Sequence, residues 1–144
     1  MSWFNKIKEK FLNKKEISDP VWEGIIIGKI IKCEKHPNAD RLKVCEVDCG
    51  NEHRTIVCGG INVQENILVP VAKPGIKVYV GGRELVELKP VVIRGVESAG
   101  MICGSDEIGL AEKFPPTQEK EILDLSKYNF APGLTLANAL KLIK

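Results

Sequence analysis

The stretch GIIIGKIIKC, residues 24–33, decides the fold. Apolar residues occupy both faces of an extended chain here, and Gly24 and Gly28 stand four residues apart. A strand that is buried on both sides and relieved by glycine can coil sharply, as the strands of a small closed barrel must. We therefore expect this stretch to be a strand of a small β-barrel.

Further short β-rich runs, separated by glycine and proline, follow along the chain. In RLKVCEVDC, residues 41–49, the apolar residues change face partway, which predicts a bulge or a strong bend. Pro74 and Gly75 suit the two central positions of a type II turn, and Pro70 indicates an edge or a bulge. Other strands are expected at residues 53–58, 67–72, 76–80, 86–93 and 121–125. Many short strands with few helices predict an all-β barrel or sandwich.

The first 16 residues have a different sequence pattern from the rest of the chain. A stripe at helical spacing runs among their lysines and consists of Trp3, Phe4, Ile7 and Phe11. The pattern predicts a basic amphipathic helix that packs on the body or on a second subunit, giving a homodimer. Alternatively, this helix lies on RNA or on a membrane surface. Residues 17–22 then read as a linker, because Pro20 discourages helix before it, and residues 23–144 form one domain.

Two short helices are expected inside this domain. Residues 105–113 open with Ser105 or Asp106 as a cap, and residues 133–143 can be capped by Thr135.

Charge and cysteine content set limits on partners and compartment. The chain holds 21 basic and 19 acidic side chains; residues 1–16 carry net +3 and the remainder net −1. An anionic partner of the body must therefore be held by a local patch. Five cysteines without paired short spacings, and no signal peptide, favour a reducing, cytoplasmic setting. No run approaches the roughly 18 apolar residues that span a bilayer, so no segment is expected to cross a membrane, and a membrane is not among the predicted partners.

A zinc site is the first chemistry to consider in HPNADRLKVCEVD, residues 36–48. Cys45 and Cys49 would be ligands, yet on a strand they stand about 13 Å apart and cannot share one ion. We predict that the cysteines are small core residues and that no metal or other cofactor is bound. Neither histidine belongs to a nucleophile motif, and no phosphate-binding P-loop is present. A protein without enzymatic activity is the prediction.

Local turn chemistry accounts for much of HPNAD, residues 36–40. Pro37 holds His36 extended, and Asn38 and Asp40 can hydrogen-bond nearby backbone. We interpret the stretch as a rigid corner joining the first two strands. Arg41 and Lys43 leave the corner on one strand face as a small basic edge.

Four ordered motifs carry a family resemblance: KCEKHPNADRLKVCEVDCG (32–50), TIVCGGINV (55–63), VVIRGVESAGMICGSDEIGL (91–110) and EILDL (121–125). Through them the chain resembles the tRNA-binding domain family. This family includes the N-terminal domain of the bacterial phenylalanyl-tRNA synthetase beta subunit, a C-terminal appendage of methionyl-tRNA synthetases, and free-standing tRNA-binding proteins. The motif sequences are most similar to those of the phenylalanyl-tRNA synthetase beta subunit. The resemblance covers about residues 23–140.

The resemblance implies an OB-fold, a five-stranded Greek-key barrel that recognises tRNA by shape and backbone. The RNA-binding residues that the resemblance implies are Asn62, Arg94, Ser98, Met101 and Ser105. Arg41 and Lys43, from the corner, complete the predicted set. An arginine can fork onto a phosphate, amide and hydroxyl groups can bond sugar or base edges, and methionine offers a soft apolar surface.

Each of these residues also has a structural alternative. Arg94 can pair with Glu97 or Glu87, Ser98 can shape a tight turn, and Met101 can belong to the core. The chain also departs from its relatives, which commonly have a serine and a basic residue where Val91 and Val92 stand here.

Two functions follow from the resemblance and its departures. The first is a non-catalytic tRNA-binding protein that supports aminoacyl-tRNA synthesis, with a synthetase as a further partner. The alternative is a protein-interaction or chaperone-like OB module with little RNA binding.

Overall fold

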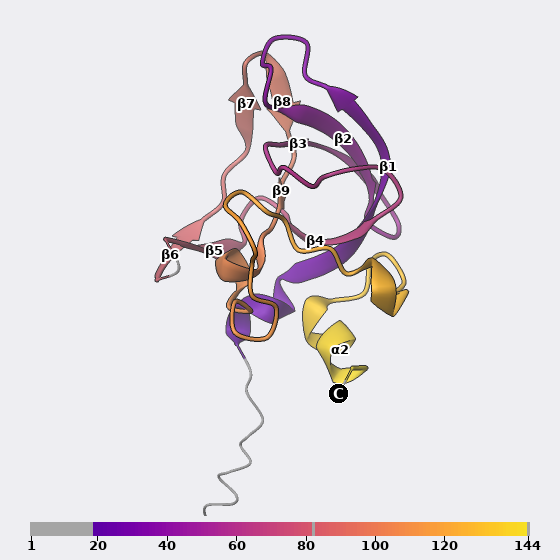
Figure 1. Cartoon of the computed structure of the whole chain (residues 1–144), viewed down its shortest axis with the longest axis vertical. Coiled ribbons are helices and arrows are strands. Elements are labelled where there is room, and N and C mark those ends of the chain that lie inside the picture. Colours follow the sequence, from indigo (N-terminus) through magenta and orange to yellow (C-terminus); the bar gives the residue numbers. More distant parts are fainter. Residues whose placement is uncertain (1–18, 82, 144) are drawn as a thin grey trace, which may run out of the picture.

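A curved antiparallel sheet of five strands forms the body of the protein in a computed structural model that describes residues 19–81 and 83–143 (Figure 1). In spatial order its strands are β3 (His53–Cys58), β2 (Lys43–Asp48), β1 (Ile25–Lys35), β4 (Leu68–Ala72) and β9 (Met101–Ile102). The helix predicted over residues 1–16 lies outside the described residues.

The long strand β1 coils as its sequence predicts. Its first half, from Ile25, pairs with β4, and its second half pairs with β2. A Cβ atom added at Gly28 would lie 2.6 Å from Cγ1 of Val47 and 2.8 Å from Cγ2 of Val71. Glycine is therefore required where the side chains of β2 and β4 close over β1.

The bulge lies in a different strand from the one predicted. The register between β1 and β2 shifts between Ile30 and Lys32, so the irregular residue is Ile31 of β1 rather than a residue of 41–49. Strand β2 alternates regularly between its two faces, with Cys45 and Val47 buried on one of them. The apparent change of face arises because the apolar residues on its other side are half-buried rather than solvent-facing.

A seam between β3 and the segment after β8 (Val96–Ser98) nearly closes the barrel. The backbone N–H of Val57 donates to Oγ of Ser98 at 3.0 Å, and the N–H of Ala99 donates to the carbonyl of Thr55 at 2.8 Å. The all-β, OB-type barrel expected from the sequence is confirmed.

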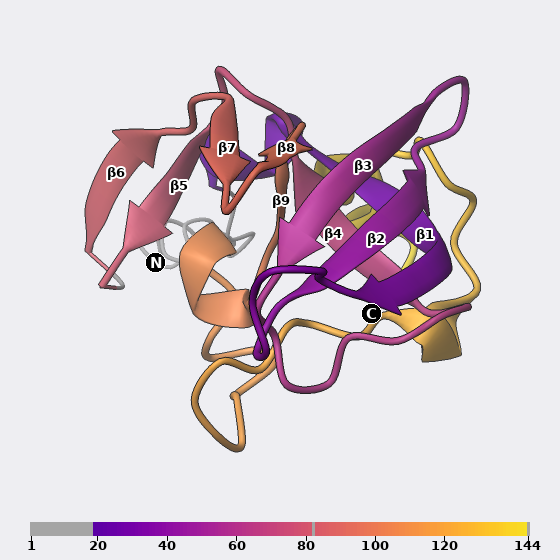
Figure 2. The same ribbon diagram turned by 90° about the horizontal axis from the view of Figure 1, so that it is seen from above.

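Two hairpins lie beside the barrel (Figure 2). One pairs β5 (Lys77–Val80) with β6 (Glu84–Glu87), and the other pairs β7 (Val91–Ile93) with β8. The single strand predicted over residues 86–93 was wrong, since β6 and β7 belong to different sheets and the intervening stretch contains Pro90.

The type II turn is confirmed. The N–H of Ile76 donates to the carbonyl of Lys73 at 3.1 Å across Pro74 and Gly75, and Gly75 has a φ of 97°.

Helices are short: η1 (Pro20–Glu23), η2 (Ser105–Ile108), η3 (Ser126–Tyr128) and α2 (Leu136–Lys141). The helix predicted over residues 105–113 shrinks to η2, because Gly109 adopts a left-handed φ of 72° and ends it. Its N-cap is Gly104, whose N–H donates to the Glu107 carboxylate at 2.7 Å. Thr135 caps α2 as predicted. None of the helices within residues 19–81 and 83–143 has the length and apolarity to cross a membrane.

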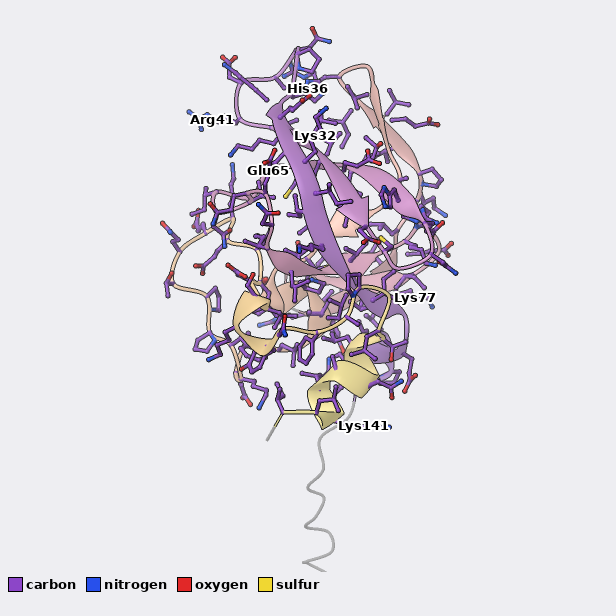
Figure 3. All side chains as sticks on the ribbon, turned by 90° about the vertical axis from the view of Figure 1, so that its right-hand side faces the viewer. Lys32, His36, Arg41, Glu65, Lys77 and Lys141 are labelled. Atoms are coloured by element: carbon purple, nitrogen blue, oxygen red, sulfur yellow. The ribbon has the colours of Figure 1, made fainter. Side chains whose placement is uncertain are left out.

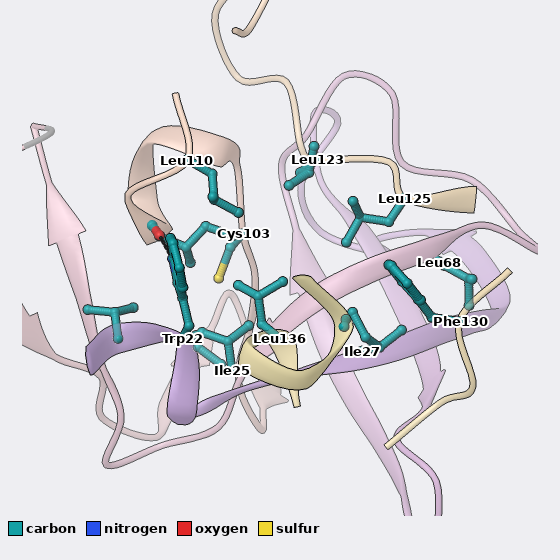
Figure 4. Packing of buried hydrophobic residues seen from close by; sticks show 14 of the residues in the cluster. Trp22, Ile25, Ile27, Leu68, Cys103, Leu110, Leu123, Leu125, Phe130 and Leu136 are labelled. Atoms are coloured by element: carbon teal, nitrogen blue, oxygen red, sulfur yellow. Dashed lines mark hydrogen bonds between the residues drawn. The ribbon is translucent and has the colours of Figure 1, made fainter. Parts of the chain in front are cut away.

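The core extends into the predicted linker. Residues 20–23 form η1, and Val21 and Trp22 are buried in the same cluster as Ile25 and Leu110, as Figure 4 shows for Trp22 and its neighbours. The packed domain therefore includes residues that a linker over 17–22 would leave outside.

Residues 121–125 form no strand, contrary to the prediction, although Ile122, Leu123 and Leu125 are buried. The N–H of Leu123 donates to the carbonyl of Cys103 at 3.1 Å, whereas the N–H of Leu125 donates to Leu68 at 2.8 Å. The first bond goes to the residue that follows β9 and the second to the first residue of β4, so no continuous ladder forms. Pro70 explains the first bond. The N–H of Cys103 donates to the carbonyl of Pro70 at 3.0 Å, but proline has no N–H to donate to the carbonyl of Cys103 in return. That carbonyl therefore accepts the N–H of Leu123 instead.

Candidate nucleic-acid interface

The corner between β1 and β2 docks on the β7–β8 hairpin through His36. The Nδ1 atom of His36 accepts the N–H of Asn38 at 2.9 Å, so Nε2 carries the proton and donates to the carbonyl of Ile93 at 2.9 Å. The side chain is only 2% exposed. His36 thus ties two loops together, as expected of a rigid corner.

Arg94 lies at the turn of the β7–β8 hairpin. Its φ is 51° and that of Gly95 is 90°, the pair of positive values that a type I′ turn requires. Its carbonyl accepts from Nδ2 of Asn38 at 3.2 Å, and its Nη1 donates to the carbonyl of Asn38 at 3.3 Å. Among the described residues no ion pair joins Arg94 to Glu97 or Glu87.

These two loops gather positive charge at one end of the barrel. We define the basic tip as the four exposed cations of residues 35–43 and 93–96, namely Lys35, Arg41, Lys43 and Arg94. Asp40 is the one carboxylate in these two ranges. Nζ of Lys43 is held by the carbonyl of Val63 at 3.3 Å. Figure 3 shows Arg41 and His36 at the end of the molecule opposite Lys141.

An open groove of about 490 Å³ begins beside the basic tip. Its lining comes from the ends of β3 and β9, η2 and the segment 120–122, and includes Arg41, Gly59, Gly60, Met101, Asp106, Glu107, Lys120 and Glu121. A Cβ atom added at Gly60 would lie 2.6 Å from Cγ2 of Ile122. Glycine here lets buried Ile122 approach the end of β3.

The far rim of the groove is mainly acidic, with the carboxylates of Asp106, Glu107 and Glu121 beside one cation, Lys120. Burial raises the pKa of Glu107, although its hydrogen bond from Gly104 acts in the opposite direction. Glu121 accepts from the N–H and the hydroxyl of Thr117 at 2.7 and 3.0 Å, and Asp106 is exposed. Phosphates are therefore favoured at the basic tip, while N–H and O–H donors suit the acidic rim.

Asn62 supports a wall of this groove. Its Nδ2 donates to the carbonyl of Ile122 at 3.0 Å, and its Oδ1 accepts the N–H of Ile122 at 2.8 Å. The side chain thus replaces a strand partner for the segment 121–125. Nothing in the local sequence indicates this long-range pairing.

Two of the predicted site residues lie inside the framework. Ser98 is 2% exposed, and its hydroxyl accepts from Val57 and donates to the carbonyl of Gly100 at 3.1 Å. Ser105 is 4% exposed at the start of η2. The structure therefore brings Arg41, Lys43 and Arg94 together, with half-buried Met101 in the adjoining groove. Lys35 and Lys120 are cations of the same region that were missed, although Lys35 precedes the HPNAD corner directly.

The cysteines behave as core residues. All but Cys33 are buried, and burial raises the pKa of the Cys49 thiol to about 11. Within residues 19–81 and 83–143, no group of three or more His, Cys, Asp or Glu side chains is arranged to hold a metal ion.

A family model for the tRNA binding domain matches residues 25–127. The chain belongs to the tRNA binding domain family. The match covers the barrel, both hairpins and the groove, so the family membership expected from the four motifs is confirmed.

Several family relatives are phenylalanine-tRNA ligase beta subunits. That of Synechocystis sp. is 50% identical over 91 residues, covering 62% of this chain and 11% of the relative. The subunit of Chlorobaculum tepidum is 48% identical over 91 residues, which cover 62% of this chain and 11% of the relative. The subunit of Oceanobacillus iheyensis is 48% identical over 99 residues, which cover 69% of this chain and 12% of the relative. The chain therefore corresponds to a small part of these translation proteins.

A solved structure shares the fold of the family. The crystal structure of a MetRS related protein from Pyrococcus horikoshii superposes with a TM-score of 0.54 at 24% identity, covering 83% of this chain and 97% of that one.

Proposed function

We propose that this protein is a non-catalytic tRNA-binding module that supports aminoacyl-tRNA synthesis in the cytoplasm. The observation that carries the proposal is the basic tip. The chain outside residues 1–16 has a net charge of −1, yet residues 35–43 and 93–96 bring four exposed cations and one carboxylate, Asp40, to one end of the barrel, with Glu34 and Glu97 adjoining them. Such a local patch is what a polyanion requires.

Binding would use shape and backbone more than base sequence. The Arg94 guanidinium can fork onto one phosphate, while Arg41 and Lys43 act on neighbouring phosphates. The groove can receive an unstacked nucleoside, with Met101 offering an apolar contact and the acidic rim accepting base or 2′-hydroxyl donors. Ser98, Ser105 and Asn62 would then act by holding this surface in place.

A protein partner is the second candidate, and exposed apolar side chains favour it. Five of them lie on β5, β6 and β7: Val80, Leu85, Val86, Val91 and Val92. Val92 is 66% exposed, in the region where relatives commonly have a serine and a basic residue. A synthetase could dock on these strands while the basic tip stays free for tRNA.

Removing the charge of Arg94 should weaken tRNA binding by about 10-fold or more at low salt and reduce the salt slope by about 1. The variant of choice is Arg94→Asn, because asparagine tolerates the positive φ of this turn. The measurement is a salt titration of binding to bulk tRNA.

Two variants control this titration. Arg94→Lys keeps the charge and should retain most of the salt slope, and Lys141→Ala removes a cation at the opposite end of the molecule and should bind as wild type does (Figure 3). Absence of salt-sensitive binding, or an equal loss in Lys141→Ala, would favour the protein-partner function instead.

The proposed homodimer contact is the aromatic stripe of residues 1–16, which lies outside the described residues and stays a prediction. Removing these residues should convert a dimer to a monomer, because the apolar stripe would be lost. Gel filtration with light scattering measures the change; an identical mass with and without the segment would refute this contact.

A further inference from the structure

Three cysteines face the inside of the barrel at the end that carries the basic tip. They come from adjacent strands: Cys33 on β1, Cys45 on β2 and Cys58 on β3. Cys33 and Cys45 are direct partners in the register of β1 and β2. Their sulfur atoms lie 3.6 Å apart, within hydrogen-bond distance for two thiols.

The backbone holds this pair in a position suited to a covalent link. The N–H of Cys33 points away from β2 and donates to the Glu65 carboxylate at 3.1 Å, so Cys33 and Cys45 are a non-hydrogen-bonded pair. Cα atoms of such a pair lie about 4.5 Å apart, inside the range of about 4.4–6.8 Å found for disulfides. Rotation about side-chain bonds is then enough to bring the sulfurs together.

We propose that Cys33 and Cys45 form a reversible dithiol–disulfide site that reacts with low-molecular-weight disulfides. The Cys33 thiolate first attacks the reagent and displaces one half as a thiolate, giving a mixed disulfide. The Cys45 sulfur then attacks the Cys33 sulfur, its proton passes to the departing half, and that second half leaves as a thiol. Two protein thiols are oxidised, and one reagent disulfide is reduced to two thiols.

Accessibility sets the order of these two steps. Cys33 is half-buried and can meet a reagent, whereas Cys45 is buried. Burial raises the pKa of Cys45 well above its ordinary value, and the nearby Cys33 adds to this, while the Lys43 ammonium acts in the opposite direction. Cys45 is therefore the thiol that resolves the intermediate rather than the one that starts the reaction.

Cys58 is not an equivalent partner. Its register partner on β2 is Lys43, and its sulfur accepts the N–H of Gly60 at 3.3 Å. Oxidation should therefore select the Cys33–Cys45 pair, closing a ring around the HPNAD corner.

The test is oxidation of the reduced full-length protein with oxidised glutathione, followed by alkylation under denaturing conditions and mass spectrometry. We expect two of the five thiols to be lost, with one link joining the peptides that contain Cys33 and Cys45, and dithiothreitol should restore both. Five retained thiols, a link that includes Cys58, or a stable glutathione adduct on the wild type would each overturn the proposal.

Single substitutions separate the two roles. Cys45→Ser should accumulate one glutathione adduct on Cys33, since no thiol remains to displace it. Cys33→Ser should acquire neither an adduct nor a disulfide. Cys103→Ser removes a buried thiol elsewhere and should oxidise as the wild type does. An adduct on Cys45 in Cys33→Ser would contradict the proposed order of attack.

Discussion

Replacing Trp22 by alanine should lower the free energy of unfolding by about 3–5 kcal/mol. Trp22 is 9% exposed and packs among the residues of the larger core cluster, including Ile25 and Leu110 (Figure 4). Its Nε1 also donates to the carbonyl of Ile108 at 2.8 Å, which joins η1 to η2. Alanine would leave a cavity and an unpaired carbonyl. Urea unfolding followed by circular dichroism measures the loss.

Trp22→Phe separates the two contributions. Phenylalanine keeps most of the buried area but cannot bond to Ile108, so the loss should be about 1–2 kcal/mol. A loss below about 1 kcal/mol in Trp22→Ala would mean that this segment contributes no more than an exposed site. Residues 17–22 would then be a linker in solution, as their sequence first indicated.

Gly28→Val should destabilise the barrel by about 3 kcal/mol or more, because added side-chain atoms overfill a packed interior. The first added carbon already lies 2.6 Å from Val47 and 2.8 Å from Val71, on the strands either side of β1. Relief would require β2 or β4 to move away and break the curvature of the sheet. Chemical denaturation again gives the free energy.

Gly59→Val is the matched control. A Cβ at Gly59 would meet only the end of the Leu42 side chain, at 3.2 Å, and that end can rotate away. The expected loss is below about 1 kcal/mol. Equal losses at Gly28 and Gly59 would show that the contacts around β1 do not set the cost.

Features that depend on neighbouring residues could be predicted from the sequence. The Pro74-Gly75 turn needs only one residue with fixed φ and one that tolerates positive φ. The HPNAD corner likewise follows from Pro37 and from short polar side chains. Apolar residues on both faces of residues 24–33 correctly indicated a coiled strand of a small barrel.

Features that depend on distant partners could not be predicted in this way. The bulge at Ile31 is set by the register of β1 against β2, not by the composition of either strand. Residues 121–125 look like a strand because they are apolar, yet their hydrogen bonds go to Cys103, Leu68 and the Asn62 side chain. No property of the segment itself specifies those partners.

The candidate site shows the same division. Arg41 and Lys43 could be selected from their alternation after the HPNAD corner and Arg94 from the resemblance, and the fold brings all three to one end. Ser98 could have been placed inside from its alternation with Val96, because residues two apart on a strand share a face. The role of Ser98 in closing the barrel could not be predicted, because the sequence does not show that β3 lies opposite this residue.

The paired hydrogen bonds between Asn38 and Arg94 have a consequence for affinity. They join two loops whose sequence separation is 56 residues, so the backbones that carry the cations are linked before any ligand arrives. Binding then loses little conformational entropy in ordering these loops, and more of the electrostatic attraction appears as affinity. An Asn38→Ala variant of unchanged net charge would therefore carry the same attraction on a less preorganised surface.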